Sequence, residues 1–301
     1  MPDPALIASA EKHLRALCAV APDRRPGSAG NREATDYVAQ QLSRAGWQVE
    51  RQDFSCLDWS TDGGFVDVGE TTVDLTPSPY GRGVAASGPV RVLGRVADLS
   101  RGDLRDAIVV LTGELTAEPL TPKGYPFYRS EDHERIVAAL EAARPVAVIA
   151  VTGRFPALCG ALDPFPLIED GNFAVPTSDV RPDAAGPLLV AEGATATIEL
   201  RSERRPAHAC NVLTRTGPSS GRVTIMAHVD TKPGTPGAVD NAAGVTVLLL
   251  LAVLLSPTRH GRLPVGVELL AVNGEDHYAA PGELAWLAAQ HDGLEDIALA
   301  V

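Results

Sequence analysis

Apolar residues follow two different repeats in the first part of the chain, and the repeats predict both helices and a strand. Near-helical spacing over residues 5–20 indicates a first helix. A second helix is expected over residues 33–45, with Asn31 as its N-cap and Gly46 at its end. Residues 47–54 then alternate between apolar and polar, as a half-buried strand does. The chain is therefore expected to begin helix, helix, strand.

The middle of the chain has a different sequence pattern. Short strand-like runs alternate with glycine and proline turns from about residue 56 to residue 200. Within this block, residues 106–111 and 146–151 are apolar runs of the length of buried strands. Residues 130–143 between them are expected to form a helix. This β–α–β unit predicts a small β-rich domain that interrupts a larger one.

The pattern from Asn211 onward alternates strands with helices, which is typical of an α/β fold. Strands are expected over residues 223–227 and 265–272. Residues 242–255 between them are apolar on every side, which predicts a helix buried between layers. Another helix is expected over residues 282–290, and a third strand begins near the end of the chain.

Histidine and acidic residues follow the two predicted strands of this last part. His228 and Asp230 come directly after the first strand, and Glu275 and Asp276 follow the second. The carboxyl ends of strands in an α/β sheet are where such folds hold their ligands. Zinc in proteins is bound by imidazole nitrogens and carboxylate oxygens, so these residue types predict a hydrolytic metal site.

Asp240 lies in a glycine- and proline-rich loop that leads into the apolar helix, and its carboxylate could bridge two cations. Taken singly, each candidate also has a structural explanation. Asp240 could be the N-cap of the helix. His228 could be a buried histidine satisfied by Asp230, and the Glu275–Asp276 pair could be solvated surface. The combination of all three motifs is far more specific than any one of them.

Composition narrows the choice of partners. The chain has 301 residues, 45% of them hydrophobic, and a formal net charge of −12. An acidic chain is not expected to bind nucleic acid or an anionic membrane. Its longest apolar run, residues 245–255, is too short to cross a bilayer. The four cysteines form no CxxC pair and the first residues lack a signal-peptide pattern, which predicts a cytoplasmic protein.

The three motifs in this order resemble peptidase family M28, a family of zinc peptidases that includes aminopeptidases. The matching stretches read NVLTRTG, RVTIMAHVDT, GAVDNAAGVTVLLLLAVLL and VELLAVNGED. The opening RRPGSAGNREATDYVAQQLSRAGWQVERQDF is similar to the family's N-terminal segment. The middle block, from DLRDAIVVLTG to VPTSDV, resembles the protease-associated domain that is often inserted in this family.

The resemblance implies a three-layer α/β/α zinc-exopeptidase core with an inserted small β-rich protease-associated domain. Residues 1–58 and 201–301 would form the peptidase domain, and residues 59–200 the insertion. His228 would bind one zinc ion, Asp276 the other, and Asp240 would bridge them. Glu275 would be the general base and Asp230 would orient His228. The implied function is hydrolysis of peptide substrates by an exopeptidase or aminopeptidase with two zinc ions.

Two departures from the family pattern keep other functions open. The family has Glu-Glu where this chain has Glu275-Asp276, although the shorter aspartate can still bind zinc. Two further ligands are expected after the next strand, where Val301 stands last, so the chain is interpreted as truncated, with an open sheet edge that favours a homo-oligomer. The alternatives are a non-catalytic protein that binds a protein or peptide, and an amidohydrolase or cyclase on the same scaffold.

Overall fold

The computed structural model describes residues 3–118, 120–121, 123, 129–151, 173–261, 263–277, 279–290 and 293–301. The chain forms two compact units. Unit 1 consists of Met1–Asp58 and Pro206–Val301, and unit 2 of Trp59–Arg205, which lies between these two segments in the sequence. The second boundary therefore falls five residues later than residue 200, where the sequence pattern suggested it.

The sheet of unit 1 has the strand order β7-β9-β8-β10, and β1 also pairs with β7. The strands are β1 (Val49–Val68), β7 (Thr195–Thr216), β8 (Arg222–His228), β9 (Val267–Val272) and β10 (Ile297–Ala300). β8 and β9 are parallel, in a register that sets His228 opposite Val272. The loops that leave these two strands therefore start side by side at one edge of the sheet.

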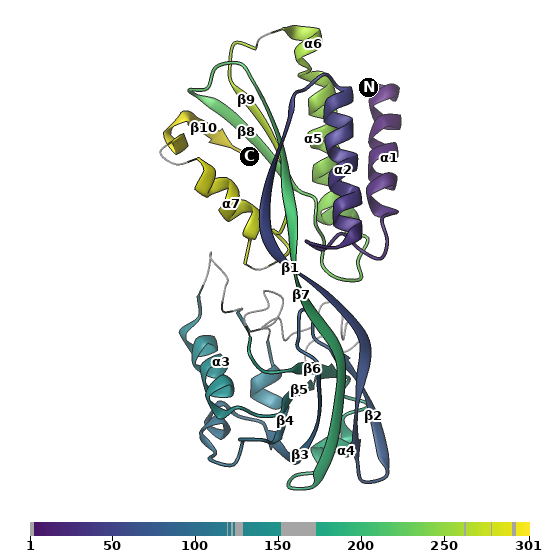
Figure 1. Cartoon of the computed structure of the whole chain (residues 1–301), viewed down its shortest axis with the longest axis vertical. Coiled ribbons are helices and arrows are strands. Elements are labelled where there is room, and N and C mark those ends of the chain that lie inside the picture. Colours follow the sequence, from purple (N-terminus) through teal and green to yellow (C-terminus); the bar gives the residue numbers. More distant parts are fainter. Residues whose placement is uncertain are drawn as a thin grey trace. The chain divides into compact units, whose positions relative to one another are not determined.

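Helices cover both faces of this sheet (Figure 1). On one face lie α1 (Pro4–Cys18), α2 (Ala29–Arg44) and α5 (Ala243–Leu254), with the short α6 (Pro257–His260) after α5; on the other lies α7 (Pro281–Ala289). The side chains of β9 explain this arrangement. Leu269 and Ala271 pack into the core beneath α1, α2 and α5, whereas Leu270 and Val272 pack with Trp286 of α7. The predicted three-layer α/β/α fold is confirmed.

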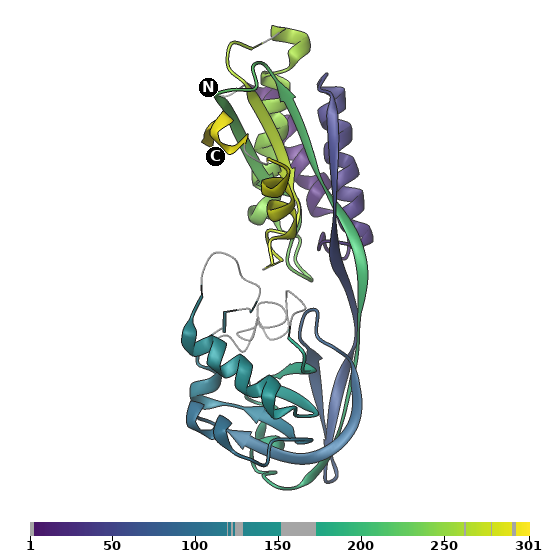
Figure 2. The same cartoon turned by 60° about the vertical axis from the view of Figure 1, so that its left-hand side comes forward.

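Unit 2 is built on a second set of strands (Figure 2), in the order β1-β2-β6-β5-β4-β3-β7. Its own strands are β2 (Thr71–Pro77), β3 (Val84–Leu93), β4 (Ile108–Leu111), β5 (Ala147–Val151) and β6 (Thr177–Val180). Its helices are η1 (Val96–Ser100), η2 (Gly113–Thr116), α3 (Glu131–Ala143) and α4 (Gly186–Leu189). β4 and β5 are parallel and wholly buried, as their apolar runs predicted. That unit 2 is a protease-associated domain stays a prediction.

Three predicted elements differ in detail from those observed. Ser28, not Asn31, is the N-cap of α2, because the Ser28 side chain accepts a hydrogen bond from the backbone N–H of Asn31. Asn31 lies inside the helix and is buried. β1 and β7 are also far longer than the runs that predicted them, since each continues from one unit into the other.

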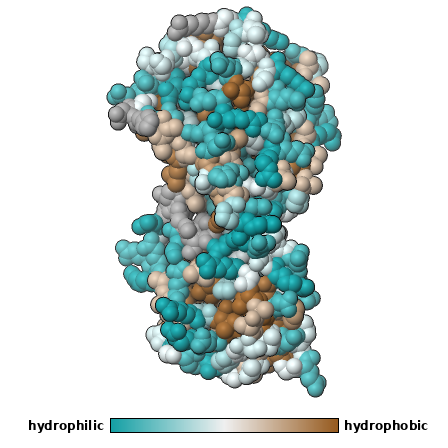
Figure 3. All heavy atoms as spheres, in the orientation of Figure 1, coloured by the Kyte–Doolittle hydropathy of each residue, from teal (hydrophilic) through white to brown (hydrophobic). Residues whose placement is uncertain are grey.

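The sequence predicted that the apolar helix α5 would be buried on every side, but one side of it is exposed. Val245, Leu248 and Leu249 lie in the core of unit 1, but Val247 is 55% exposed. The longer helical stretch Ala238–His260 is also long and apolar enough, by length and composition alone, to cross a membrane. Core helices of soluble proteins pass the same test, and hydrophilic residues cover most of the face drawn in Figure 3.

Candidate metal centre

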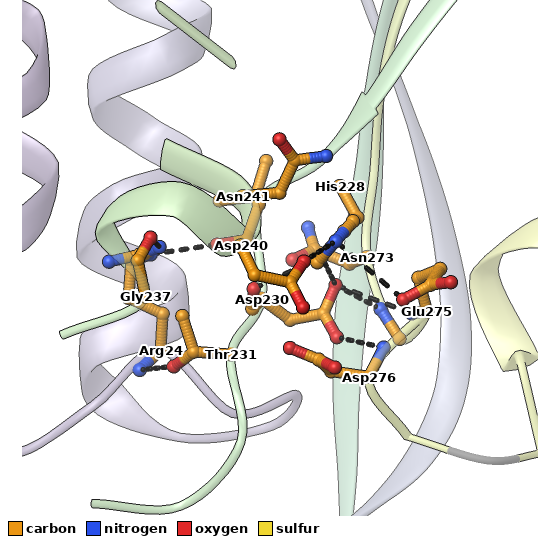
Figure 4. Close-up of polar contacts among 12 residues, drawn as sticks. Arg24, His228, Asp230, Thr231, Gly237, Asp240, Asn241, Asn273, Glu275 and Asp276 are labelled. Carbon is orange, nitrogen blue, oxygen red and sulfur yellow. Dashed lines mark hydrogen bonds and ion pairs between the residues drawn. The ribbon is translucent and has the colours of Figure 1, made fainter. Parts of the chain in front are cut away.

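The candidate site lies where β8 and β9 end, in unit 1 (Figure 4). β8 contributes His228 as its last residue, and the segment after β9 contributes Glu275 and Asp276. Asp240 comes from η4 (Ala238–Ala242), the irregular turn that precedes α5. The parallel register of the two strands is what brings these segments together.

Asp230 holds the loop after β9 in place. Its side chain is fully buried and accepts hydrogen bonds from the backbone N–H groups of Gly274 (2.7 Å), Glu275 (3.3 Å) and Asp276 (3.0 Å). The backbone carbonyl of Asp230 lies 3.2 Å from Nδ1 of His228, and one carboxylate oxygen lies 3.7 Å from the same nitrogen. The buried carboxylate of Asp230 thus contacts both the imidazole of His228 and the backbone of the acidic loop.

The other ring nitrogen of His228 faces the remaining acids. Nε2 lies 2.9 Å from Oδ1 of Asp240 and 3.6 Å from Oε2 of Glu275. The Asp240 side chain is 73% exposed and caps no helix; the residue at the N-cap of α5 is Ala242. The N-cap explanation of Asp240 is therefore wrong, because the irregular turn carries its carboxylate toward the imidazole instead.

His228, Asp240 and Asp276 form a group suited to a metal ion. One ligand atom from each lies within 4.8 Å of the others. An imidazole nitrogen with two carboxylate oxygens is a donor set that zinc accepts, and three protein ligands are usual at a catalytic zinc. Over the described ranges this is the one group of its kind, so the residues fit one ion, and a full ligand set for a second ion is not found among them.

The site carries more negative than positive charge. Burial opposes protonation of His228, but hydrogen bonding and charge from Asp230, with the charges of Glu275 and Asp276, outweigh burial and raise its pKa to about 10. Burial and the charge of Asp230 raise the pKa of Asp276 to about 7. Carboxylates crowded together in this way favour a bound cation, whether a proton or a metal ion.

Arg24 supports the site from a distant part of the sequence. It is 1% exposed, and its guanidinium donates to the backbone carbonyls of Leu17, Val229, Pro236 and Gly237. These bonds fix the chain between β8 and η4, and hence the position of Asp240. No sequence signal identifies this role, because the carbonyls of Val229, Pro236 and Gly237 lie more than 200 residues further along the chain.

The sequence motifs contain Asn211 and Asn273 but gave neither a role, and they missed Glu283. Asn273, directly after β9, is fully buried and accepts a 2.6 Å hydrogen bond from Asn31 of α2. Its backbone N–H donates to Oδ1 of Asn211 at 2.9 Å. Glu283 in α7 lies in the same electrostatic environment, since burial and the charges of Glu275 and Asp230 raise its pKa to about 7.

Comparison with known proteins shows what the segment that holds the candidate site is similar to. Residues 211–295, which include every candidate ligand, match the family model of peptidase family M28. This segment of the chain is similar to the peptidases of family M28. It is also 26% identical over 249 residues to the probable lipoprotein aminopeptidase LpqL of Mycobacterium tuberculosis, an alignment that covers 79% of this chain and 46% of that protein. The M28-like chain thus spans about half the length of this curated relative.

Solved structures share the fold at low sequence identity. An aminopeptidase from Aneurinibacillus sp. strain AM-1 matches with a TM-score of 0.71 and 20% identity, over 96% of this chain and 68% of that one. A zinc aminopeptidase from Bacillus subtilis matches with a TM-score of 0.66 and 20% identity, over 89% of this chain and 61% of that one. A peptidase M28 precursor from Shewanella amazonensis SB2B matches with a TM-score of 0.67 and 19% identity, over 99% of this chain and 72% of that one. These likenesses show that the M28-like chain has the fold of these structures.

Proposed function

We propose that this chain carries the site of a zinc-dependent peptidase of the aminopeptidase type. The observation that carries the proposal is the cluster of ligand atoms from His228, Asp240 and Asp276 within 4.8 Å of one another. These residues lie inside the segment that matches peptidase family M28. The relatives that resemble the chain over most of its length bear the names of aminopeptidases, one of them a zinc enzyme.

His228, Asp240 and Asp276 would hold zinc. The exposed Asp240 carboxylate has a second oxygen, which supports a bridging role between two ions, as the family resemblance implies. Bound zinc would lower the pKa of a water molecule and polarise the scissile carbonyl. The negative surplus around His228 fits this role, because a divalent cation would offset the repulsion among the carboxylates.

Glu275 is the proposed general base. Its side chain is 48% exposed and its carboxylate lies 3.6 Å from the ring of His228, so it can contact both solvent and the metal ligands. In this role it accepts a proton from the attacking water and returns it to the leaving amine. Glu275 and Asp276 are neighbours in sequence whose side chains diverge, which allows one to act on the proton while the other binds metal.

Asp230 is the proposed positioning residue. It bonds the backbone of Gly274, Glu275 and Asp276 and lies against Nδ1 of His228. A carboxylate beside a metal-binding histidine fixes the orientation of the ring and raises its basicity as a ligand. Asp230 therefore acts through other groups and need not touch the substrate.

The substrate we propose is a peptide with a free amino terminus. The acids around His228 give the site a negative surplus, which attracts the ammonium group of such a peptide. The test compares hydrolysis of an aminoacyl p-nitroanilide with that of its N-acetylated counterpart by zinc-loaded protein. Hydrolysis of the free-amine compound alone, abolished by 1,10-phenanthroline and restored by zinc, is the expected result.

Other outcomes of this test would separate the alternatives. Equal hydrolysis of the free and acetylated anilides would support a different amidohydrolase and contradict the aminopeptidase assignment. No hydrolysis of either compound by protein with bound zinc would contradict a peptidase site and favour a non-catalytic, peptide-binding protein.

A further inference from the structure

A second charged site lies among the helices of unit 1, apart from the metal centre. A cavity of about 280 Å³, open to solvent, is lined by residues of α1, the end of α2, the second half of α5 and the segment through α6. Asp240 precedes the first turn of α5, whereas Leu249 and Val253 of the later turns line the cavity. A cavity of this size suits a small ligand.

The charged side chains that line this cavity are cations. Lys12 of α1, Arg44 of α2 and Arg259 of α6 reach it, and no carboxylate of the described residues is among its lining groups. Within the described ranges none of the three pairs with an acid, in a chain whose net charge is −12. The neighbouring acid Glu11 is instead paired with Arg15, at 2.8 Å.

The wall of the cavity also holds an ordered polar group. His13 is 6% exposed, and its ring nitrogens lie 2.7 Å from the hydroxyl of Tyr37 and 3.3 Å from that of Ser9. Burial and the charge of Lys12 lower the pKa of His13, which keeps the imidazole neutral near pH 7. The wall of the cavity therefore includes a neutral histidine held by two hydrogen bonds, beside the exposed cations.

Helix dipoles explain only part of this arrangement. Arg44 lies in the last turn of α2 and Arg259 in the last turn of α6, where cations are stabilised by the negative end of the helix. Lys12 lies in the middle of α1, and no such effect applies to it. Cations from separate helices that meet at one cavity without a counter-charge indicate an anionic ligand.

We propose that this cavity binds a multiply charged oxyanion of the phosphate type. A single carboxylate would offset only one of the cations, whereas a phosphate group carries more charge and offers several acceptor oxygens. Arginine guanidinium groups match phosphate oxygens in pairs, and the lysine ammonium adds a point charge. The group could belong to a soluble phosphate or to the headgroup of a lipid, and the experiment below distinguishes these sources.

The experiment measures binding to the purified full chain by isothermal titration calorimetry at constant ionic strength. One arm titrates inorganic phosphate; the other adds phosphatidylcholine vesicles with or without phosphatidic acid. The variants are Arg44→Gln and Lys12→Gln, so that the test survives if either one fails to fold. Arg15→Gln, on the same helix as Lys12 but outside the cavity, is the matched control.

We expect saturable binding that each cavity variant weakens by about tenfold or more, because a hydrogen bond to a charged group is lost, while Arg15→Gln leaves it unchanged. Binding of free phosphate would identify a soluble ligand, and binding confined to phosphatidic acid vesicles would identify a lipid headgroup. Absence of both, or binding by Arg44→Gln and Lys12→Gln as tight as by Arg15→Gln, would overturn the proposal. Peptide hydrolysis is not part of the readout, so the result is independent of the proposed peptidase activity.

Discussion

Unit 2 and the metal centre of unit 1 differ in how their acidic residues are paired. In unit 2 several surface acids pair with arginines, as Asp103 and Glu192 do with Arg101, and Asp183 with Arg181. At the metal centre of unit 1, several carboxylates share a single imidazole. Paired surface charges contribute little to function or stability. Charge without a counter-charge inside a built site is what points to a ligand, so unit 1 holds the proposed chemistry.

The largest effect is expected when the proposed base is removed. Glu275→Gln should lower kcat by about 10³-fold, because general-base catalysis contributes on the order of 10²–10⁴-fold. The zinc content should not change, since Glu275 is not among the proposed ligands. The matched control is Glu131→Gln in unit 2, an exposed residue paired with Arg135. Steady-state kinetics that show the same loss for both variants, or for neither, would contradict the role of Glu275.

Loss of Arg24 should destabilise unit 1 strongly. Arg24→Met leaves the carbonyls of Val229, Leu17 and Pro236 without their charged donor, at a cost of about 3 kcal/mol or more. Urea unfolding of the metal-free protein measures this change. Arg135→Met in unit 2, where the arginine forms exposed ion pairs, should cost less than about 1 kcal/mol. Similar losses in the free energy of unfolding for both variants would show that the buried hydrogen bonds of Arg24 contribute no more to stability than exposed ion pairs do.

Asp230→Asn tests the positioning role with a smaller expected effect. An amide oxygen cannot accept the same set of backbone N–H bonds as a carboxylate, and it removes the negative charge beside His228. Zinc affinity should fall by about 10–100-fold, as is usual for residues that orient metal ligands. Competition with a chelator of known affinity measures it. Asp183→Asn, an exposed aspartate in unit 2, should leave zinc affinity unchanged.

The smallest effect concerns pH. The pKa of Glu283 rises from its usual 4.5 to about 7 in the folded protein, so the folded state holds its proton more tightly than the unfolded state does between these values. The contribution of Glu283 to stability is therefore present below about pH 4.5 and is lost as pH rises through about 7. Glu283→Gln should make the Tm of metal-free protein less dependent on pH in this window. An unchanged pH profile would exclude this contribution.

The sequence predicts the scaffold and the chemistry of this chain better than the supports of its site. β8 and β9 are rich in apolar residues, and the motif residues stand at their ends or shortly after them. The strands and the candidate ligands can therefore be predicted from the sequence. Arg24 and Asn31 act through backbone groups and an amide far away in sequence, which no local pattern encodes. The predictions of a homo-oligomer and a cytoplasmic location stay predictions.

The central claim is that His228, Asp240 and Asp276 bind zinc, and elemental analysis of protein equilibrated with zinc and then dialysed tests it most directly. At least one zinc ion per chain is expected for the wild type and for the control His260→Gln. Within the part of the chain that the structure describes, the side chain of His260 hydrogen-bonds the backbone carbonyl of Leu254, away from the candidate ligands. His228→Gln should retain close to none. Zinc-free wild-type protein, or equal zinc in His228→Gln and His260→Gln, would contradict the claim.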